Sequence, residues 1–495
     1  MTRPPRRELG LALLVLCCSA HIGSPDAWYQ GPAGPYDVLI RVQPPLVVPG
    51  IAAVEVRPAH AGVTRITAVI NRFDAGATPP PPDVALPLRD RPGWYGTRLW
   101  VMTTGSNSVT VTLEGTAGSG SVVVPLSAVA GRRLGFARGL AGLLLAAGLV
   151  LAAGWFTIIG AAVRESVLPP GEEPDATRRR RARWVMLRSV LVLGAVLSAW
   201  TLWWRAEDRR FARGLYRPLA LRAGIDTTAG IPRLTLTITD SAWIHRHDAA
   251  WQRGRRPRDA SELVEDHGKL MHLFLVAEGT RSAFAHLHPG STDMVTFVAT
   301  LPPLPPGRYA AFADVVHASG FTETLTATLQ LDSALTRRVA ATPSDADDSW
   351  WTGEPARALS ARLEDGSRLE WLRPAGPLIA GQEAGLRFVL QSTEPKAPEL
   401  YLGMAGHAAV VRNDDSVFIH LHPLGSISLA AQAQLLARLP AGRGHSMAPP
   451  SPADTLSFPY AFSRPGNYTV WVQLRRGGRI LTAGFPATVE AGAGR

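Results

Sequence analysis

Histidines are the residues of this chain whose spacing could do chemistry, and they gather in two short stretches. The first, residues 266–289, reads DHGKLMHLFLVAEGTRSAFAHLHP and carries His272, His286 and His288. It predicts two short strands joined by the polar turn AEGTRS. Side chains at positions i and i+2 of a strand share a face, so His286 and His288 point the same way. An antiparallel hairpin of even register brings His272 opposite one of them, and three imidazoles can then meet.

The second stretch, residues 404–423, repeats this pattern as MAGHAAVVRNDDSVFIHLHP. His407, His420 and His422 take the places of the three histidines of the first stretch. The segments that follow, GRYAAFADVV and GNYTVWVQL, also match. An internal repeat of this length indicates one module written twice. We therefore predict a first module at residues 215–335 and a second module at 356–490, each carrying the histidine hairpin.

Clustered histidines predict a metal site. Imidazole suits copper, zinc, iron and nickel, and thioether suits Cu(I); we expect copper, with zinc as the alternative ion. The candidate ligands are His267, Met271, His272, His286, His288 and His317 in the first module, and Met404, His407, His420 and His422 in the second. The second site should be the weaker one, because nothing there matches His267. Binding should weaken as pH falls through about 6.5, since the ligand is neutral imidazole.

The rest of the chain predicts a mainly β protein. Residues 25–131 and both modules consist of short, β-branched segments bounded by glycine, proline and asparagine, which is typical of immunoglobulin-like sandwiches. Between the first and second sandwich, residues 136–163 and 185–205 are long and apolar enough for transmembrane helices. The predicted architecture is three sandwiches, with a two-helix membrane hairpin between the first and the second.

The arginines and the N-terminus predict which side each part occupies. Residues 164–184 lie between the two apolar segments and contain the run RRRRAR, so the positive-inside rule puts this connection in the cytoplasm. Residues 1–24 have a basic start and a short apolar run, which is typical of a secretory signal peptide. Both signals predict an inner (cytoplasmic) membrane protein with its β-regions on the periplasmic or extracellular side.

Composition bears on partners and on chemistry. The net charge is +11, but lysine occurs only at Lys269 and Lys396 and the arginines are scattered, so we expect no nucleic-acid partner. The expected partners are the lipid bilayer and an envelope protein. Both cysteines lie in the signal peptide, which excludes thiolate metal sites from the cleaved chain. The sequence contains no HExxH motif, no glycine-rich phosphate loop and no indication of a Ser-His-Asp set, so we do not expect an enzyme.

The stretches DHGKLMH, GMAGH and the two HLHP segments resemble the CopC- and YtkA-like copper carriers of the bacterial periplasm. The first sandwich followed by a helix resembles FixH-like membrane proteins, and the chain as a whole resembles exported membrane-anchored proteins. These resemblances imply a non-enzymatic copper binder that acts in metal handling or in copper-enzyme assembly. The alternative is an envelope scaffold of immunoglobulin-like modules, in which the histidines are incidental at strands ended by Pro289 and Pro423.

Overall fold

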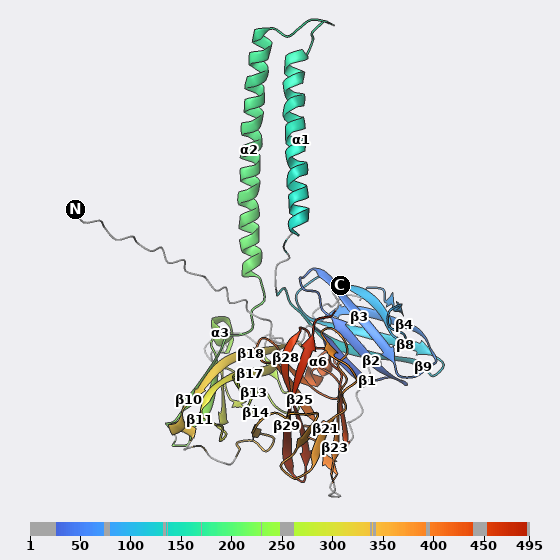
Figure 1. The fold of residues 1–495 in the computed structure, drawn as a ribbon, viewed down its shortest axis with the longest axis vertical. Helices are drawn as coiled ribbons and strands as arrows, with labels where there is room; N and C mark the ends of the chain where they lie inside the picture. The colour runs from blue at the N-terminus through green and yellow to red at the C-terminus, as the bar shows by residue number, and fades with distance from the viewer. Residues whose placement is uncertain are drawn as a thin grey trace, which may run out of the picture. The chain divides into compact units, whose positions relative to one another are not determined.

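The computed structural model describes residues 26–73, 80–131, 135, 137–169, 171–228, 230–247, 262–336, 339, 343–392, 397–438 and 453–492. The predicted signal peptide, residues 1–24, lies outside them. The described residues form mainly antiparallel β-sheets and two long apolar helices between β-regions, which confirms the predicted fold class (Figure 1). The β-regions make up one compact unit, and residues 129–217 with the two helices make up another.

The N-terminal sandwich pairs a five-stranded sheet with a four-stranded one. The first sheet has the order β1 (Ala27–Ala33), β2 (Tyr36–Gln43), β3 (Gly50–Pro58), β7 (Tyr95–Val101) and β6 (Leu86–Pro87), and the second has β5 (Asp83–Val84), β4 (Val63–Arg72), β8 (Gly105–Gly115) and β9 (Gly118–Ala128). Val38, Ile40 and Val42 alternate along β2 and face Val111 of the other sheet in one core. The intervening Leu39 and Arg41 point to the other face of the strand, which is buried as well.

The first module is a sandwich of the same kind. One sheet has the order β10 (Leu221–Asp226), β11 (Arg233–Ile238), β16 (Thr296–Thr300) and β15 (Gly290–Ser291). The other has the order β12 (Leu263–Val264), β17 (Gly307–His317), β13 (His272–Ala277), β14 (Ala283–Leu287) and β19 (Ser349–Thr352), with β18 (Thr322–Leu331) beside β17. The short helices α3 (Ser241–His247) and α5 (Ser333–Thr336) accompany them.

The second module repeats this arrangement. One sheet has the order β20 (Ser360–Arg362), β21 (Arg368–Trp371), β23 (Leu386–Gln391) and β27 (Thr455–Phe458). The other has the order β22 (Leu378–Ile379), β29 (Arg479–Glu490), β28 (Gly466–Arg476), β25 (His407–Arg412) and β26 (Phe418–Leu421), with β24 (Pro398–Glu399) beside β28. The central order β18–β17–β13–β14 of the first module matches β29–β28–β25–β26 here. These four strands have the same order in both modules, whereas the strands at the edges of the sheets differ.

The two modules pack against each other through the outer faces of their hairpin sheets. Leu273 and Leu275 of β13 point into the core of the first module, so Phe274 and Val276 lie on the opposite face. We call the nine residues buried between the modules the interface cluster: Phe274, Val276, Phe284, Ala310, Phe312, Ala409, Val411, Phe418 and Trp471. The apolar hairpin faces are thus covered by one another.

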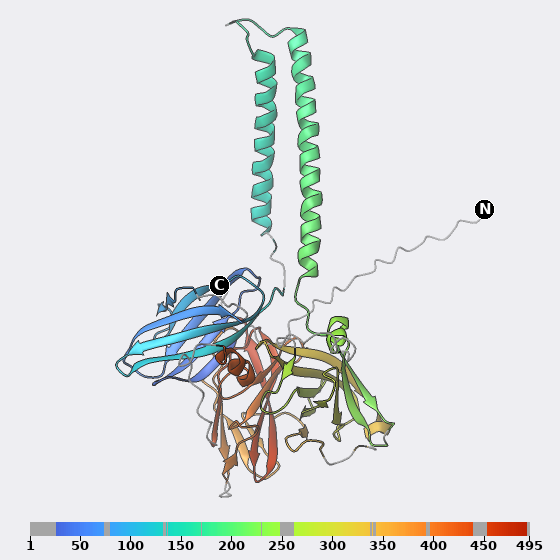
Figure 2. The same ribbon diagram turned by 180° about the vertical axis from the view of Figure 1, so that it is seen from behind.

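Helix α6 (Leu429–Leu436) follows the hairpin of the second module and contacts the N-terminal sandwich. Ser428 caps it, accepting a hydrogen bond from the backbone N–H of Ala431. Gln432 donates from its side chain to the carbonyl of Val123 in β9 at 2.7 Å. Figure 2 shows this short brown helix lying against the blue sheet of the N-terminal sandwich. The helix thus joins the second module to that sandwich.

Helices α1 (Arg138–Glu165) and α2 (Ala176–Arg213) run side by side as a hairpin in both views (Figures 1 and 2). Both are long and apolar enough to cross a membrane, which allows a membrane location. One detail corrects the sequence interpretation. The arginine run at 178–183 lies in the first turns of α2 and not in a loop, because Asp175 caps the helix by accepting from the backbone N–H of Arg178 at 2.7 Å.

Candidate metal centre

Six histidines lie on the two hairpin faces that meet between the modules. In the first module Phe274 pairs with His286, and this register puts His272 and His288 at opposed positions on the same face. The second module has the same arrangement, in which Ala409 pairs with His420. We call His272, His286 and His288 the first triad, and His407, His420 and His422 the second triad. All six are buried.

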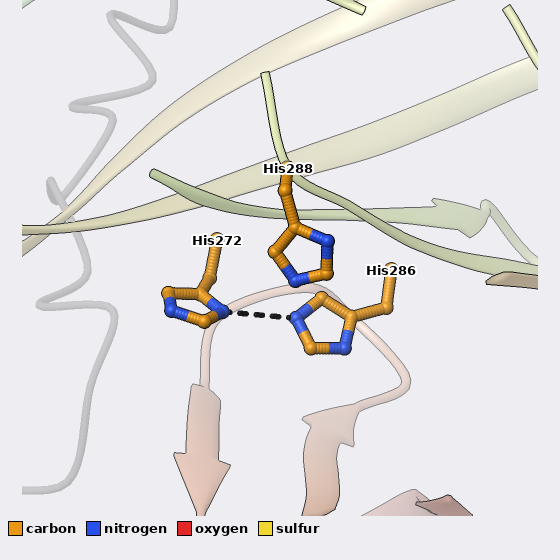
Figure 3. Close-up of side chains that lie close together, drawn as sticks. All are labelled: His272, His286 and His288. Carbon is orange, nitrogen blue, oxygen red and sulfur yellow. Dashed lines mark hydrogen bonds between the residues drawn. The ribbon is translucent and has the colours of Figure 1, made fainter. Parts of the chain in front are cut away.

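The ring nitrogens of each triad converge. One nitrogen from each member lies within 4.8 Å of the others in both triads, so each group could hold a metal ion. Nδ1 of His272 is 3.2 Å from Nε2 of His286, which is the dashed line in Figure 3. In the same figure the ring of His288 points one nitrogen toward the space between the other two. In the second triad, Nδ1 of His407 is 3.0 Å from Nε2 of His420.

Acceptors around the first triad fix the protonation of two of its rings. Nε2 of His272 lies 3.0 Å from the carbonyl oxygen of Asp266. A carbonyl can only accept, so this nitrogen carries the hydrogen. Tyr401 donates its hydroxyl hydrogen to the carbonyl of Asp347 at 2.9 Å. The tyrosine oxygen must therefore accept from Nδ1 of His286, which is 3.1 Å away.

The third ring is fixed by a carboxylate. Nδ1 of His288 lies 3.1 Å from Oδ1 of Asp348 and donates to it. Its Nε2 is buried and has no hydrogen-bond partner within the described part of the chain. With the hydrogens placed by these acceptors, the nitrogens that face one another, Nδ1 of His272 and Nε2 of His286 and His288, all carry lone pairs. Lone pairs at this distance repel unless a cation lies between them, and carboxylate-oriented histidine is typical of metal ligands.

A proton is a poor candidate for that cation, because burial disfavours the charged form of the histidine rings. Burial lowers the pKa of His272 to about 3, with a further lowering by the neighbouring His288. Burial also lowers the pKa values of His286 and His407 well below the ordinary 6.5. The rings are then neutral at physiological pH, and neutral imidazole is the form that binds metal.

The second triad is also surrounded by oxygen atoms that face its ring nitrogens. Nε2 of His407 lies 3.0 Å from the carbonyl oxygen of Tyr401, so its Nδ1 carries the lone pair. Nδ1 of His420 faces Oδ2 of Asp314 at 3.6 Å, and burial raises the pKa of this carboxyl to about 7. Burial lowers the pKa of His420 well below its ordinary value and that of His422 to about 3. This triad too is a cluster of neutral rings.

The two triads adjoin each other across the module interface. The ring centroids of His272 and His420 are 5.3 Å apart, and those of His286 and His407 are 6.0 Å apart. Nδ1 of His286 also lies 2.9 Å from Oε1 of Gln473 in the second module. Each triad is therefore completed by side chains of the other module, and the six histidines form one buried centre.

Four further candidate ligands lie in different surroundings. His317 belongs to the β17 positions that face the sandwich core, and its Nε2 contacts Oε1 of Glu323 at 2.7 Å, so it is not part of the first triad. Met271 packs in that same core. Met404 is buried and pairs through its backbone with Tyr401. His267 lies beside both triads, with ring centroids 4.9 Å from His422 and 6.1 Å from His272.

A third group, His288 with Asp345 and Asp348, could also hold a cation by distance alone. Nζ of Lys269 already lies 2.6 Å from Oδ1 of Asp345 and 3.1 Å from Asp347. An ammonium group therefore occupies part of that carboxylate cluster, and Asp348 is engaged by His288. The two histidine triads are the better metal candidates.

Sequence reasoning missed the residues that orient the triads. Tyr401, Asp348, Gln473 and Asp314 are a tyrosine, a linker aspartate and two mid-strand residues, and no motif marks them. One sequence signal was available, because aligning the repeated segments GRYAAFAD and GNYTVWVQ pairs Asp314 with Gln473. In the structure, these two residues stand opposite His272 and His407 in the registers of β17 and β28.

Comparison with known proteins gives little more. Residues 362–491, which cover most of the second module, match the model of a "Domain of unknown function (DUF8832)". No curated protein matches the chain. Among solved structures, an engineered protein is 20% identical over 17% of this chain and 17% of its own, with a TM-score of 0.14. Dimeric latent PorU from Porphyromonas gingivalis is 8% identical over 94% of this chain and 34% of its own, also with a TM-score of 0.14.

Proposed function

We propose that this chain is a membrane-anchored copper-binding protein whose two modules hold metal at the paired triads. The observation that carries the proposal is the convergence of three lone pairs, from Nδ1 of His272 and Nε2 of His286 and His288, in a buried site where protonation is disfavoured. With these tautomers no hydrogen lies between the three nitrogens, and a metal cation would satisfy all of them.

The ligand set favours copper. Imidazole suits copper, zinc, iron and nickel, and Cu(II) binds nitrogen sites most tightly among the divalent ions of this series. Neutral rings bring no charge to offset that of the ion, and burying an uncompensated charge is costly. A monovalent ion lowers this cost, so the triads suit Cu(I) in particular. Zinc remains the alternative that the binding experiment must compare.

The burial of the triads favours holding an ion over substrate turnover. His286 and His407 are fully buried, and His420 is the most exposed member at 8%. The apolar hairpin faces that an envelope scaffold would offer to another protein are covered by the sister module, so the scaffold alternative has less support. The proposed role is therefore metal handling, or delivery of copper during the assembly of a copper enzyme.

The proposed location is the cytoplasmic membrane with both β-regions outside the cytoplasm. Two apolar helices allow the membrane location. The arginine run at 178–183 lies at the start of α2 and supports a cytoplasmic position for the connection between the helices. The apolar N-terminal segment of the sequence supports export of the N-terminal sandwich.

The test is metal binding by the full-length chain in detergent. The wild type, His286→Ala with His288→Ala, and His420→Ala with His422→Ala are titrated with Cu(I), Cu(II) and Zn(II) against a competing chelator. We expect one ion per triad in the wild type and one fewer in each double variant, while replacement of the exposed His60 changes nothing. If the wild type binds none of these ions more tightly than a variant that combines all four substitutions, the proposal is wrong.

A further inference from the structure

His267 belongs to the first module by sequence, but its ring lies closer to the second triad. Its ring centroid is 4.9 Å from that of His422 and 5.7 Å from that of His407, against 6.1 Å from that of His272. The side chain is only 5% exposed. Two of its three histidine neighbours are thus members of the other module's triad.

Nε2 of His267 is buried and lacks a hydrogen-bond partner in the described residues. Its nearest carboxylate oxygen, Oδ1 of Asp266, is 3.9 Å away, which is too long for a hydrogen bond. That carboxylate oxygen accepts instead from the backbone N–H of Ala430 at the start of α6. A buried polar atom without a partner destabilises the fold, so a fold that keeps one at this place calls for a ligand.

The turn that carries His267 occurs twice, and only one copy has a histidine. Asp266 and Lys269 exchange two backbone hydrogen bonds around it, and His267 has a φ of 54°. In the second module Tyr401 and Met404 close the equivalent turn, in which Leu402 has a φ of 51°. The left-handed backbone is therefore a property of the turn itself. The difference between the copies is an imidazole in one and an aliphatic side chain in the other.

We infer that His267 is a fourth nitrogen ligand of the second triad, so that this site is a four-histidine site shared between the two modules. The inference rests on the proposed metal-binding function and adds that the two sites differ in their affinity for the metal. The first triad receives no equivalent ligand, because the repeat has Leu402 at that position. The second site is therefore the tighter one, contrary to the expectation from the sequence, and the ion bound there links the modules.

The experiment isolates the second site in the full-length chain. A background variant with His286→Ala and His288→Ala removes the first triad. His267→Leu is then added, since leucine occupies the same turn position in the other copy, and His267→Asn is made in parallel because asparagine tolerates the left-handed conformation. Each protein is titrated with Co(II), whose visible absorption reports the number and geometry of its ligands.

We expect both substitutions at His267 to weaken Co(II) binding at least about tenfold, since losing even a group that only orients a ligand costs 10–100-fold, and to change the absorption spectrum. Replacement of His60 in the same background should change neither. If the background binds Co(II) and both His267 variants bind it equally tightly with the same spectrum, His267 is not a ligand, while the proposed function stands. If the wild type itself binds no metal, the proposed function is wrong and this inference with it.

Discussion

Nδ1 of His286 lies 2.9 Å from Oε1 of Gln473, although the two residues are 187 positions apart and belong to different modules. The reverse crossing is present as well, because Oδ2 of Asp314 lies 3.6 Å from Nδ1 of His420. Gln473 and Asp314 hold equivalent positions in β28 and β17. Each module therefore places a polar side chain beside a histidine of the other, and the two copies of the repeat pack face to face at this site.

Replacing Gln473 with leucine should weaken metal binding by the first triad, although Gln473 belongs to the second module. The substitution removes an acceptor from Nδ1 of His286, and loss of such an orienting partner typically costs 10–100-fold in affinity. The measurement is a chelator competition on the full-length chain. Gln473→Glu keeps an acceptor and should restore most of the affinity.

The matched control for this prediction is Gln391→Leu. Gln391 is exposed on β23 and donates its side-chain N–H to Glu370, and β23 belongs to the sheet of the second module that does not carry the triad. Equal loss of affinity in the two leucine variants would contradict an orienting role for Gln473.

The metal-free protein should lose stability as pH falls from about 6.5 toward about 3. Burial holds the pKa values of His272 and His422 at about 3 in the folded chain, whereas an unfolded histidine titrates near 6.5. Between these values the unfolded chain binds more protons, so the free energy of unfolding decreases with falling pH. The slope is about 1.4 kcal/mol per pH unit for each such histidine.

Denaturant titrations of the metal-free chain at pH 7.5, 6.0 and 5.0 test this prediction. The same rings stay neutral in the folded state below pH 6.5, so acid should release metal together with unfolding and not by simple titration near 6.5. Release of metal with a midpoint near 6.5 from a chain that is still folded would contradict the lowered pKa values.

Phe418→Ala should destabilise the packing of the modules by about 3–5 kcal/mol, the usual cost of removing a buried phenylalanine. Its ring stacks on Phe312 of the first module with centroids 4.5 Å apart. The triads depend on this packing, so metal affinity should fall as well. Phe458→Ala, inside the core of the second module, should lower stability to a similar degree with a smaller effect on metal affinity.

Protease added to intact spheroplasts should digest both β-regions and spare the connection between α1 and α2. The expected topology puts the arginines at 178–183 on the cytoplasmic side. Antibodies or tags placed in the N-terminal sandwich and near the C-terminus would report the cleavage. Protection of the C-terminal modules in spheroplasts, together with their digestion after lysis, would reverse the topology.

The amino-acid sequence by itself determined which residues share a face. The spacing of two between His286 and His288, and the repeat of that pattern at His420 and His422, are sufficient to place each pair on one side of a strand, because successive side chains point to opposite faces. The same alternation puts the side chain of Met271 on the other face of the chain from that of His272. The sequence also predicted two apolar segments long enough for α1 and α2 to span a membrane, since a span needs about 20 apolar residues.

The tertiary structure alone decided what covers those faces. A strand pattern gives the buried face but not the surface against which it packs, so the sequence could not show that the two hairpins meet. Nor could it show that Gln473 reaches His286, or that His267 lies nearer His422 than His272. These contacts join residues far apart in the chain, and their geometry follows from the packing of the interface cluster, which local spacing does not encode.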